Sequence, residues 1–325
     1  MQASPIFPTA KPRAGMYESF YLRAFAPEQP LGVWIRHTVH KRPGMAPEGS
    51  IWCTVFDARR EAPFMTKSSS GELEAPAGGW ISVGGRAAFG PGWAEGSCGE
   101  ASWSLRFTSA EPALHHLSPE WLYRAPLPRT KLTSPAPLAR FSGSLALAGS
   151  EPIALEDWAG MVGHNWGTEH AERWIWLHGA GFAQAPEAWL DIALGRILIG
   201  RRLTPWVANG MLSLDVVRHR LGGLRGPRPQ VQESVSGCSI SMPGRGGLQL
   251  ALRARTPAGL AAGWRYADPD GGEHDVVNCS IAELELDVHA PAQPRRSLSS
   301  AHGGAYELGM RERDHGIPIA PFADG

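Results

Sequence analysis

The sequence lacks the features that several large classes of protein need. It has no net charge, since 31 basic residues are matched by 31 acidic ones, so no overall field attracts a nucleic acid. Its four cysteines are far apart and include no CxxC pair, which argues against a disulfide framework or a structural zinc site. We expect buried, reduced thiols in a cytoplasmic protein. These cysteines are Cys53, Cys98, Cys238 and Cys279.

Long hydrophobic runs and the familiar cofactor motifs are also missing. No window approaches the 18 or so uninterrupted apolar residues of a membrane-spanning helix. The segment 1–15 lacks the apolar stretch of a secretory signal. The sequence contains no glycine-rich nucleotide-binding motif, no HExxH and no GxSxG. We therefore expect neither a cofactor nor a metal ion.

Short stretches of alternating apolar and polar residues fill the chain, bounded by many of its 39 glycines and 28 prolines. Roughly a dozen such stretches predict an all-β protein with two antiparallel sandwiches or barrels. The segment 268–272 (DPDGG) predicts a hairpin turn rather than a calcium loop. Helical turns are expected only near 119–124 and 155–161. The expected strands include 17–26, 31–41, 50–57, 80–89, 101–108, 143–148, 174–179, 189–194, 212–219, 231–241, 247–255, 260–267 and 280–289.

The segment 157–191 differs from the rest of the chain. It holds five of the 13 tryptophans, together with several histidines and acids. Polar groups among so many aromatic rings are costly to bury unless they are paired. The segment is therefore the first place to look for a site. Its notable residues are Trp158, His164, Asn165, Trp166, Glu169, His170, Glu172, Trp174, Trp176, His178, Trp189 and Asp191.

Three features of this segment carry a resemblance to a known family. They are Gly163–Gly167 (GHNWG), the aromatic stretch Trp174–Gly179 (WIWLHG), and Trp189–Asp191 (WLD). Together they resemble the carotenoid 1,2-hydratase family, within a wider group of tandem lipocalin-like proteins that includes tocopherol cyclase-like and Diels–Alderase-like members. Segments 17–20 and 304–309 fit the layout of that group. Here Gly163 stands where the hydratases carry Asp, and Trp189 where they carry Tyr.

The resemblance implies a fold and a place for the site. The fold is two lipocalin-like antiparallel β-barrels in tandem, over residues 1–170 and 171–325. The site is expected in the crevice between the barrels, since small-molecule pockets often lie between domains.

The residue types suggest how such a site could act. Protonating an alkene needs a carboxylic acid whose pKa is raised by burial, and aromatic faces stabilise the resulting cation. We expect Asp191 to be this acid. Neutral His164 would orient it or activate water, and Trp166 follows on the same strand face. Residues expected to bind the substrate are Asn165, Trp174, Trp176, Trp189, Tyr306 and Glu307.

Each assignment has a structural alternative. Asp191 could pair with Arg196, while His164 and Asn165 could hold the turn between the barrels. The tryptophans could be ordinary core residues. The spacing of His164, His170 and His178 fits no standard zinc motif. His37 is expected in the core, and His115 and His116 in solvent.

Two functions from different classes remain open. One is a cofactor-free enzyme that hydrates, dehydrates or cyclises an isoprenoid-like hydrophobic substrate by acid catalysis. The other is a protein that binds a lipid or another small hydrophobic ligand without chemistry. The expected partner is a hydrophobic small molecule, with transient membrane contact during its collection and no nucleic acid. The sequence leaves the oligomeric state open.

Overall fold

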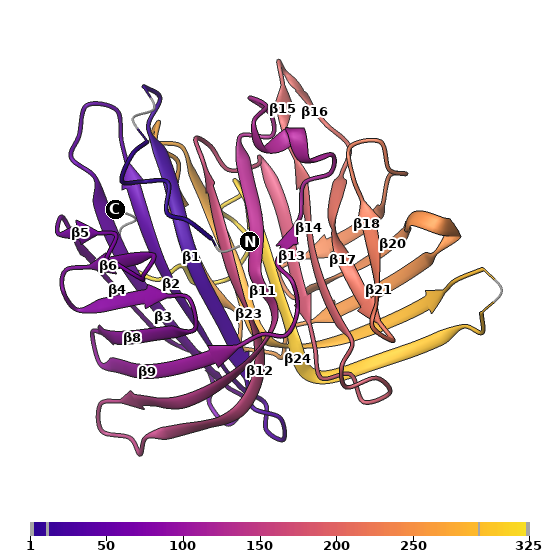
Figure 1. Ribbon diagram of the computed structural model, residues 1–325, viewed down its shortest axis with the longest axis horizontal. Coiled ribbons are helices and arrows are strands. Elements are labelled where there is room, and N and C mark those ends of the chain that lie inside the picture. Colours follow the sequence, from indigo (N-terminus) through magenta and orange to yellow (C-terminus); the bar gives the residue numbers. More distant parts are fainter. Residues whose placement is uncertain (1–2, 11–12, 292, 323–325) are drawn as a thin grey trace.

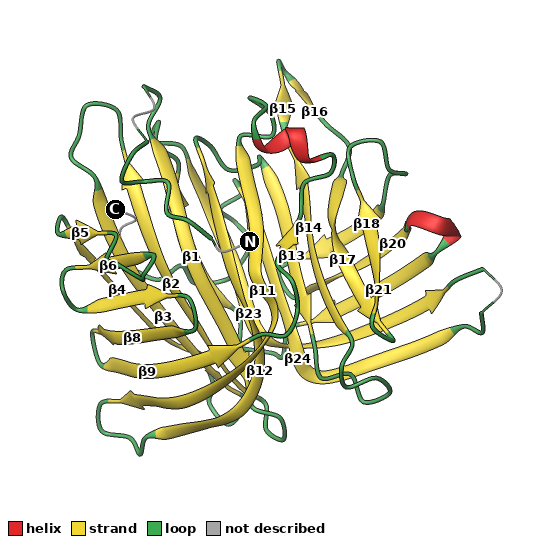
Figure 2. Ribbon diagram, in the orientation of Figure 1, coloured by secondary structure: helices red, strands yellow, loops and turns green. Residues whose placement is uncertain are grey.

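The computed structural model describes residues 3–10, 13–291 and 293–322, and it is all-β (Figure 2). The strands form two large antiparallel sheets, one in each half of the chain, which Figure 1 shows side by side. The described residues otherwise contain one small hairpin and two short 3-10 helices. The predicted fold class, two lipocalin-like antiparallel barrels in tandem, is confirmed.

The first sheet has 12 strands and curls around its own core. Its first and last strands, β1 and β12, pair with each other. β4 and β8 are not paired by backbone hydrogen bonds, but their side chains are in contact. Sγ of Cys98 on β8 lies within hydrogen-bond distance of the Thr66 and Ser68 hydroxyls on β4. The strands are β1 (Met16–Phe25), β2 (Leu31–Lys41), β3 (Glu48–Asp57), β4 (Phe64–Ser70), β5 (Leu73–Glu74), β6 (Ile81–Val83), β7 (Ala87–Gly90), β8 (Trp93–Cys98), β9 (Ala101–Thr108), β10 (Leu114–His115), β11 (Thr130–Leu147) and β12 (Ile153–Gly167).

The second sheet has 10 strands and follows the same plan, because β13 and β24, its first and last strands, also pair. Its strands are β13 (Arg173–Gly179), β14 (Trp189–Arg196), β17 (Val207–Leu214), β18 (Val217–Gly222), β19 (Gln230–Ser234), β20 (Gly237–Pro243), β21 (Gln249–Arg255), β22 (Ala262–Ala267), β23 (Glu273–His289) and β24 (Arg296–Met310). The remaining elements are the hairpin β15 (Leu198–Ile199) and β16 (Arg202–Leu203) and the 3-10 helices η1 (Glu120–Tyr123) and η2 (Arg245–Gly247). The two sheets divide between Gly167 and Arg173. The division of the chain into domains 1–170 and 171–325 stays a prediction.

The burial of each strand shows which of its faces is covered. β9 alternates buried and exposed residues, as expected for a strand with one face in water. β1 is buried along its whole length. Phe20 and Leu22 point into the first core, while Tyr21 and Arg23 on the other face contact the second half. The outer faces of the two sheets therefore cover each other, with β1, β2 and β3 lying against β23.

Arg23 is a fully buried cation at this interface. Its Nη1 lies 2.9 Å from Nδ1 of His178 and donates to the carbonyl of Gly303 at 3.0 Å, while Nη2 donates to the carbonyl of Ser280 at 2.8 Å. Nε2 of His178 lies 2.8 Å from the carbonyl of Pro137. Neutral His178 with the proton on Nε2 satisfies both contacts.

Most predicted strands are present, but several boundaries were wrong. The stretches 80–89, 212–219 and 231–241 are each two strands joined by a tight turn. Gly84 and Gly85 have positive φ values at the first of these turns, as a hairpin turn requires. The predicted helical turn at 155–161 is part of β12, because pairing with β1 and β11 outweighs local preference.

Other sequence-based expectations are confirmed. The segment 119–124 contains η1, and 268–272 forms the turn between β22 and β23. His37 is buried in the first core, and the four cysteines are buried and unpaired. Among the described residues, no helix is long and apolar enough to cross a membrane.

Replacing Arg23 with Met should strongly destabilise the protein. The substitution leaves Nδ1 of His178 and the carbonyl of Ser280 without the Arg23 donor and removes one of two donors to the carbonyl of Gly303, which should lower the free energy of unfolding by about 3 kcal/mol or more. Urea denaturation at pH 7 measures this loss. The control Arg106→Met removes an exposed pair with Glu95 and should change stability by less than about 0.5 kcal/mol. A loss below about 1 kcal/mol for Arg23→Met would contradict the structural role.

Candidate functional site

A cavity of about 590 Å³ lies between the two halves and is lined mainly by apolar and aromatic side chains. The first half contributes Tyr21, Arg36 and Asn165, and the second contributes Trp174 and Glu307. Its volume is in the range typical of small-molecule sites. The cavity lies where the resemblance implied a site, in the crevice between the barrels.

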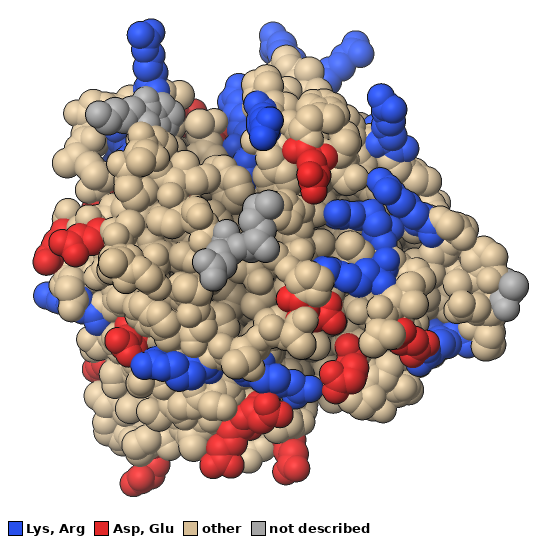
Figure 3. Space-filling view, in the orientation of Figure 1, with Lys and Arg blue, Asp and Glu red and all other residues tan. Residues whose placement is uncertain are grey.

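Exposed apolar side chains surround the mouth of the cavity. Trp121 on η1 and Ile199 on β15 both line the cavity, and each is 58% exposed. Leu127 and Leu224 also line it and are exposed. In Figure 3 basic side chains gather over the part of the molecule that carries β15, β16 and β18. A hydrophobic molecule could therefore enter past an apolar rim that has positive charges beside it.

Asp191 on β14 is fully buried behind the cavity wall. Its Oδ1 accepts a hydrogen bond from Nε1 of Trp176 at 3.1 Å, and its Oδ2 accepts one from Ser134 at 2.5 Å. Nε2 of His116 lies 3.3 Å from the same Oδ2. The alternative pairing with Arg196 is wrong, since that side chain donates to the carbonyl of Thr204.

His116 was predicted to be solvated, and this prediction was wrong. The side chain is fully buried, with Nδ1 3.2 Å from the carbonyl of Asn209 and Nε2 facing Asp191. Nδ1 therefore faces a carbonyl acceptor, while Nε2 lies beside both Oδ2 of Asp191 and the Ser134 hydroxyl, which is 3.1 Å away. No sequence pattern pointed to this partner, because His116 lies 75 positions before Asp191, in the connection between β10 and β11.

The expected raised pKa of Asp191 is also wrong. Burial raises the pKa of this carboxyl group, but the contributions of His116 and His178 and the hydrogen bond from Ser134 together outweigh burial. The pKa of Asp191 therefore lies below its ordinary value, so at neutral pH this group is a carboxylate rather than a proton donor.

Glu307 on β24 differs from Asp191 because it lines the cavity and is only partly buried. Its Oε1 accepts a hydrogen bond from Nε1 of Trp174 at 2.8 Å. Its Oε2 accepts bonds from Asn278 at 3.2 Å and from Tyr266 at 3.4 Å. Three donors fit a carboxylate, which only accepts hydrogen bonds.

Two glycines make room for aromatic rings at this interface. A Cβ on Gly163 would lie 2.1 Å from the Tyr21 ring, and a Cβ on Gly309 would lie 2.1 Å from the Trp174 indole. Tyr21 therefore occupies the space beside position 163, where the hydratases carry an acid. Burial raises the pKa of its hydroxyl well above the ordinary value, and the charges of Asp191 and Glu307 add to the effect.

His164 and Trp166 lie on the opposite face of β12, away from Asp191. Nε2 of His164 lies 2.7 Å from Oε1 of Glu18, and its ring stacks on Phe20 and Trp166. Glu18 also accepts hydrogen bonds from the backbone of the N-terminal segment. The three residues predicted to act together are therefore separated. Asp191 lies at the interface between the two halves, whereas His164 and Trp166 lie on the face of β12 that points away from this interface.

The remaining predicted binding residues fall into two groups. Asn165, Trp174, Trp176 and Glu307 line the cavity. Trp189 is fully buried against Leu114 and Met211. Tyr306 is buried in the second core, where its hydroxyl donates to the carbonyl of Ser234. Neither Trp189 nor Tyr306 lines the cavity, so core packing accounts for both.

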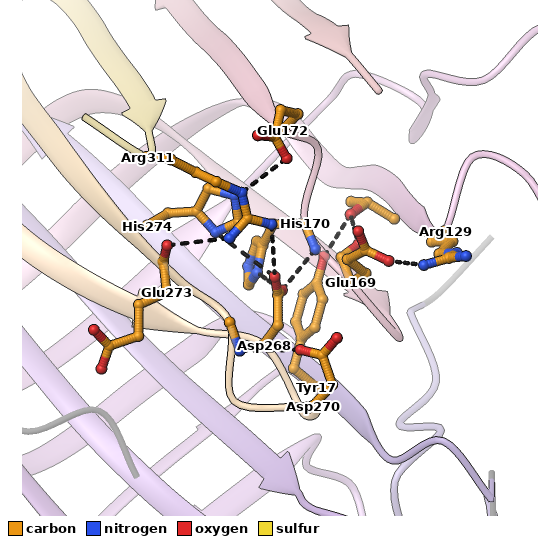
Figure 4. Close-up of polar contacts among 12 residues, drawn as sticks. Tyr17, Arg129, Glu169, His170, Glu172, Asp268, Asp270, Glu273, His274 and Arg311 are labelled. Atoms are coloured by element: carbon orange, nitrogen blue, oxygen red, sulfur yellow. Dashed lines mark hydrogen bonds and ion pairs between the residues drawn. The ribbon is translucent and has the colours of Figure 1, made fainter. Parts of the chain in front are cut away.

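One cluster of the described residues has the composition of a metal site: His170, Asp268 and His274. Their possible ligand atoms lie within 4.8 Å of one another. However, Oδ1 of Asp268 already accepts from the backbone and ring of His170, and Nη2 of Arg311 lies 3.9 Å from Oδ2 (Figure 4). A guanidinium beside the carboxylate opposes a second cation, so these residues fit a metal ion poorly.

Comparisons with known proteins agree with this fold. The chain is 26% identical over 317 residues to the uncharacterized Mycobacterium tuberculosis proteins Rv0493c and MT0513, which covers 95% of this chain and 90% of theirs. No protein-family model matches the chain.

Solved structures of similar shape cover nearly the whole chain. CghA with Sch210972 superposes with a TM-score of 0.61 and 12% identity, covering 95% of this chain and 94% of CghA. Kievitone hydratase from Nectria haematococca gives a TM-score of 0.53 and 10% identity, covering 95% and 93%. The Nitrosomonas europaea protein NE1406 gives 0.53 and 12%, covering 95% and 97%. At such low identity these structures show that the fold is shared.

Acid should destabilise the protein through His178. Burial, together with the charge of the neighbouring Arg23, lowers the pKa of this imidazole from its ordinary value of 6.5 to about 4. In the unfolded chain His178 therefore binds a proton below about pH 6.5, whereas in the folded protein it binds one only below about pH 4. Linkage predicts a loss of about 2 kcal/mol from this group between pH 7 and pH 5.

The variant His178→Gln isolates this contribution. A glutamine can accept from Arg23 and donate to Pro137 without titrating, so its unfolding free energy should fall about 2 kcal/mol less between pH 7 and pH 5. Urea denaturation at the two pH values measures the difference. An equal fall in variant and parent would show that His178 is not the group responsible.

Proposed function

We propose that the protein is an enzyme that adds water to a hydrophobic small molecule, removes water from it, or cyclises it by proton transfer in the cavity between the barrels. The observation that carries this proposal is the position of Glu307, a carboxylate on the wall of an apolar cavity of about 590 Å³. The kievitone hydratase named above shares the fold, which adds support. The resemblance noted in the sequence implies the same class of reaction.

Glu307 is the group best placed to move a proton. Trp174, Tyr266 and Asn278 hold both of its oxygens, so its position relative to a bound molecule is fixed. A carboxylate in this position can take a proton from water or from the substrate as a general base and return it as an acid. The apolar lining excludes other water, which keeps the reaction selective.

Asp191 would act through its neighbours rather than on the substrate. Trp176 and His116 both line the cavity, and both contact the Asp191 carboxylate. Asp191 and Glu307 lie two strands apart, on either side of Trp176, which corresponds to roughly 10 Å. We assign Asp191 the role of positioning the Trp176 indole and holding the proton of His116.

A binding protein without chemistry is the second candidate. The apolar lining and the exposed rim would serve it equally well. The two candidates differ in what they require of Glu307. Only an enzyme needs a proton acceptor there, because burial of apolar surface alone supplies affinity.

Replacing Glu307 with Gln separates the two functions. The amide keeps the size of the side chain but cannot accept a proton, so turnover should fall by roughly 10²–10⁴-fold. Ligand affinity, measured by quenching of tryptophan fluorescence, should change by less than about tenfold. The substrates for the turnover assay are the hydrophobic compounds that co-purify with the protein. Mass spectrometry measures the product formed from them.

Two further variants complete the test. Asp191→Asn should lower turnover because it weakens the contact with His116. Since the role of Asp191 is indirect, turnover should fall less than in Glu307→Gln. Glu285→Gln alters an exposed carboxylate that pairs with Arg253 and should leave turnover unchanged. Full activity of Glu307→Gln would exclude the proposed reaction and leave the binding protein.

A further inference from the structure

The cavity contains a positive charge that the proton transfer at Glu307 does not by itself require. Arg36 on β2 lines the cavity and is only 5% exposed. Its guanidinium carbon lies 4.0 Å from the centroid of the Tyr266 ring and 5.4 Å from that of Trp52. Its Nε donates to Ser19 at 3.1 Å. These contacts hold the guanidinium in place, but none of them carries a negative charge.

One nitrogen of this guanidinium has no protein partner. Nη1 of Arg36 is buried and makes no hydrogen bond within the described part of the chain. An arginine side chain stays charged in proteins, and a buried N–H without an acceptor is costly. Arg23, the other buried arginine on these strands, has three acceptors for its terminal nitrogens. Arg36 also lines the cavity, so the natural acceptor for its guanidinium is a ligand atom there.

The hydrogen bonds of Ser19 fix the orientation of the Arg36 guanidinium. The Ser19 hydroxyl donates to Oδ1 of Asn165 at 2.8 Å, which leaves its oxygen to accept from Nε of Arg36. Asn165 also lines the cavity. The guanidinium is thus fixed through residues of β1 and β12, two neighbouring strands of the first sheet.

The sign of this charge limits the reaction. A carbocation formed by protonating an isolated alkene would be repelled by Arg36. An oxyanion at the same place would be stabilised by the same charge. The cavity therefore suits a reaction in which negative charge develops on oxygen.

We infer that the reacting double bond of the substrate is conjugated to a carbonyl group whose oxygen accepts a hydrogen bond from Arg36. The reaction step rests on the proposed function. Glu307 removes a proton from water as the water oxygen bonds to the β-carbon, and the alkene electrons move onto the carbonyl oxygen to form an enolate. The enolate oxygen is held by Arg36. Protonation of the α-carbon by Glu307 then gives the β-hydroxy carbonyl compound and restores the carboxylate.

Binding of two probes of matched shape tests the inference. Chalcone has an enone between two phenyl rings, and trans-stilbene has the same rings joined by an alkene without a carbonyl. Quenching of tryptophan fluorescence should show chalcone binding at least tenfold more tightly than stilbene. Arg36→Met should abolish this preference by weakening chalcone binding alone. Equal affinities in the parent protein, absence of chalcone binding, or an unchanged preference in Arg36→Met would each overturn the inference.

Two additional variants keep this test independent of folding. Ser19→Ala leaves the charge but removes the group that orients it, so the preference for chalcone should fall without disappearing. Arg202→Met alters an exposed arginine on β16 and should keep the full preference. Thermal unfolding shows whether each variant is folded before binding is measured.

Loss of enone absorbance measures turnover of chalcone, and this readout is independent of the affinity for chalcone. Preference for chalcone without any Glu307-dependent turnover would support carbonyl binding at Arg36 and contradict the enzyme. Turnover of an isoprenoid hydrocarbon that lacks a carbonyl, abolished by Glu307→Gln, would support the enzyme and overturn the inference.

Discussion

The burial of two sheet faces against each other is the constraint on which the rest of this structure depends. A strand has two faces, and β1 must bury both, one in its own barrel and one against the second half. Its outer face includes Arg23, whose donors reach only acceptors of the second half. Polar groups on such a face need partners within the protein, because burial separates them from solvent. The two halves are therefore joined by hydrogen bonds as well as by apolar contact.

The candidate site arises where this interface opens into the cavity. Arg36 and Glu307 project from the same two outer faces that elsewhere press together. Around them, aromatic rings fill the space that Gly163 and Gly309 leave free. A base and a cation, both fixed by neighbouring side chains in an apolar surrounding, form the kind of preorganised environment that proton-transfer reactions need. The interface that stabilises the fold thus also builds the site.

The sequence predicted parts of this arrangement well and others poorly. Alternation identified most strands, since one covered face gives a period of two, as in β9. β12 was missed in part because one of its two pairing partners, β1, is far away in the chain. The clustering of tryptophans pointed to Trp174 and Trp176, which do line the cavity. The same clustering grouped His164 with Asp191, although successive strand positions face opposite sides and β12 carries His164 into the first core.

By itself the sequence determined the all-β class, the presence of two antiparallel units, the aromatic segment and the buried state of its cysteines. These follow from local patterning and composition, which need no knowledge of distant contacts. Only the tertiary structure decided which polar groups meet. His116 faces Asp191, Arg23 faces His178, and Arg36 and Glu307 share one cavity, because pairing of strands far apart in the chain brings them together. The electrostatics of each group, and hence the chemistry it can perform, depends on those distant neighbours.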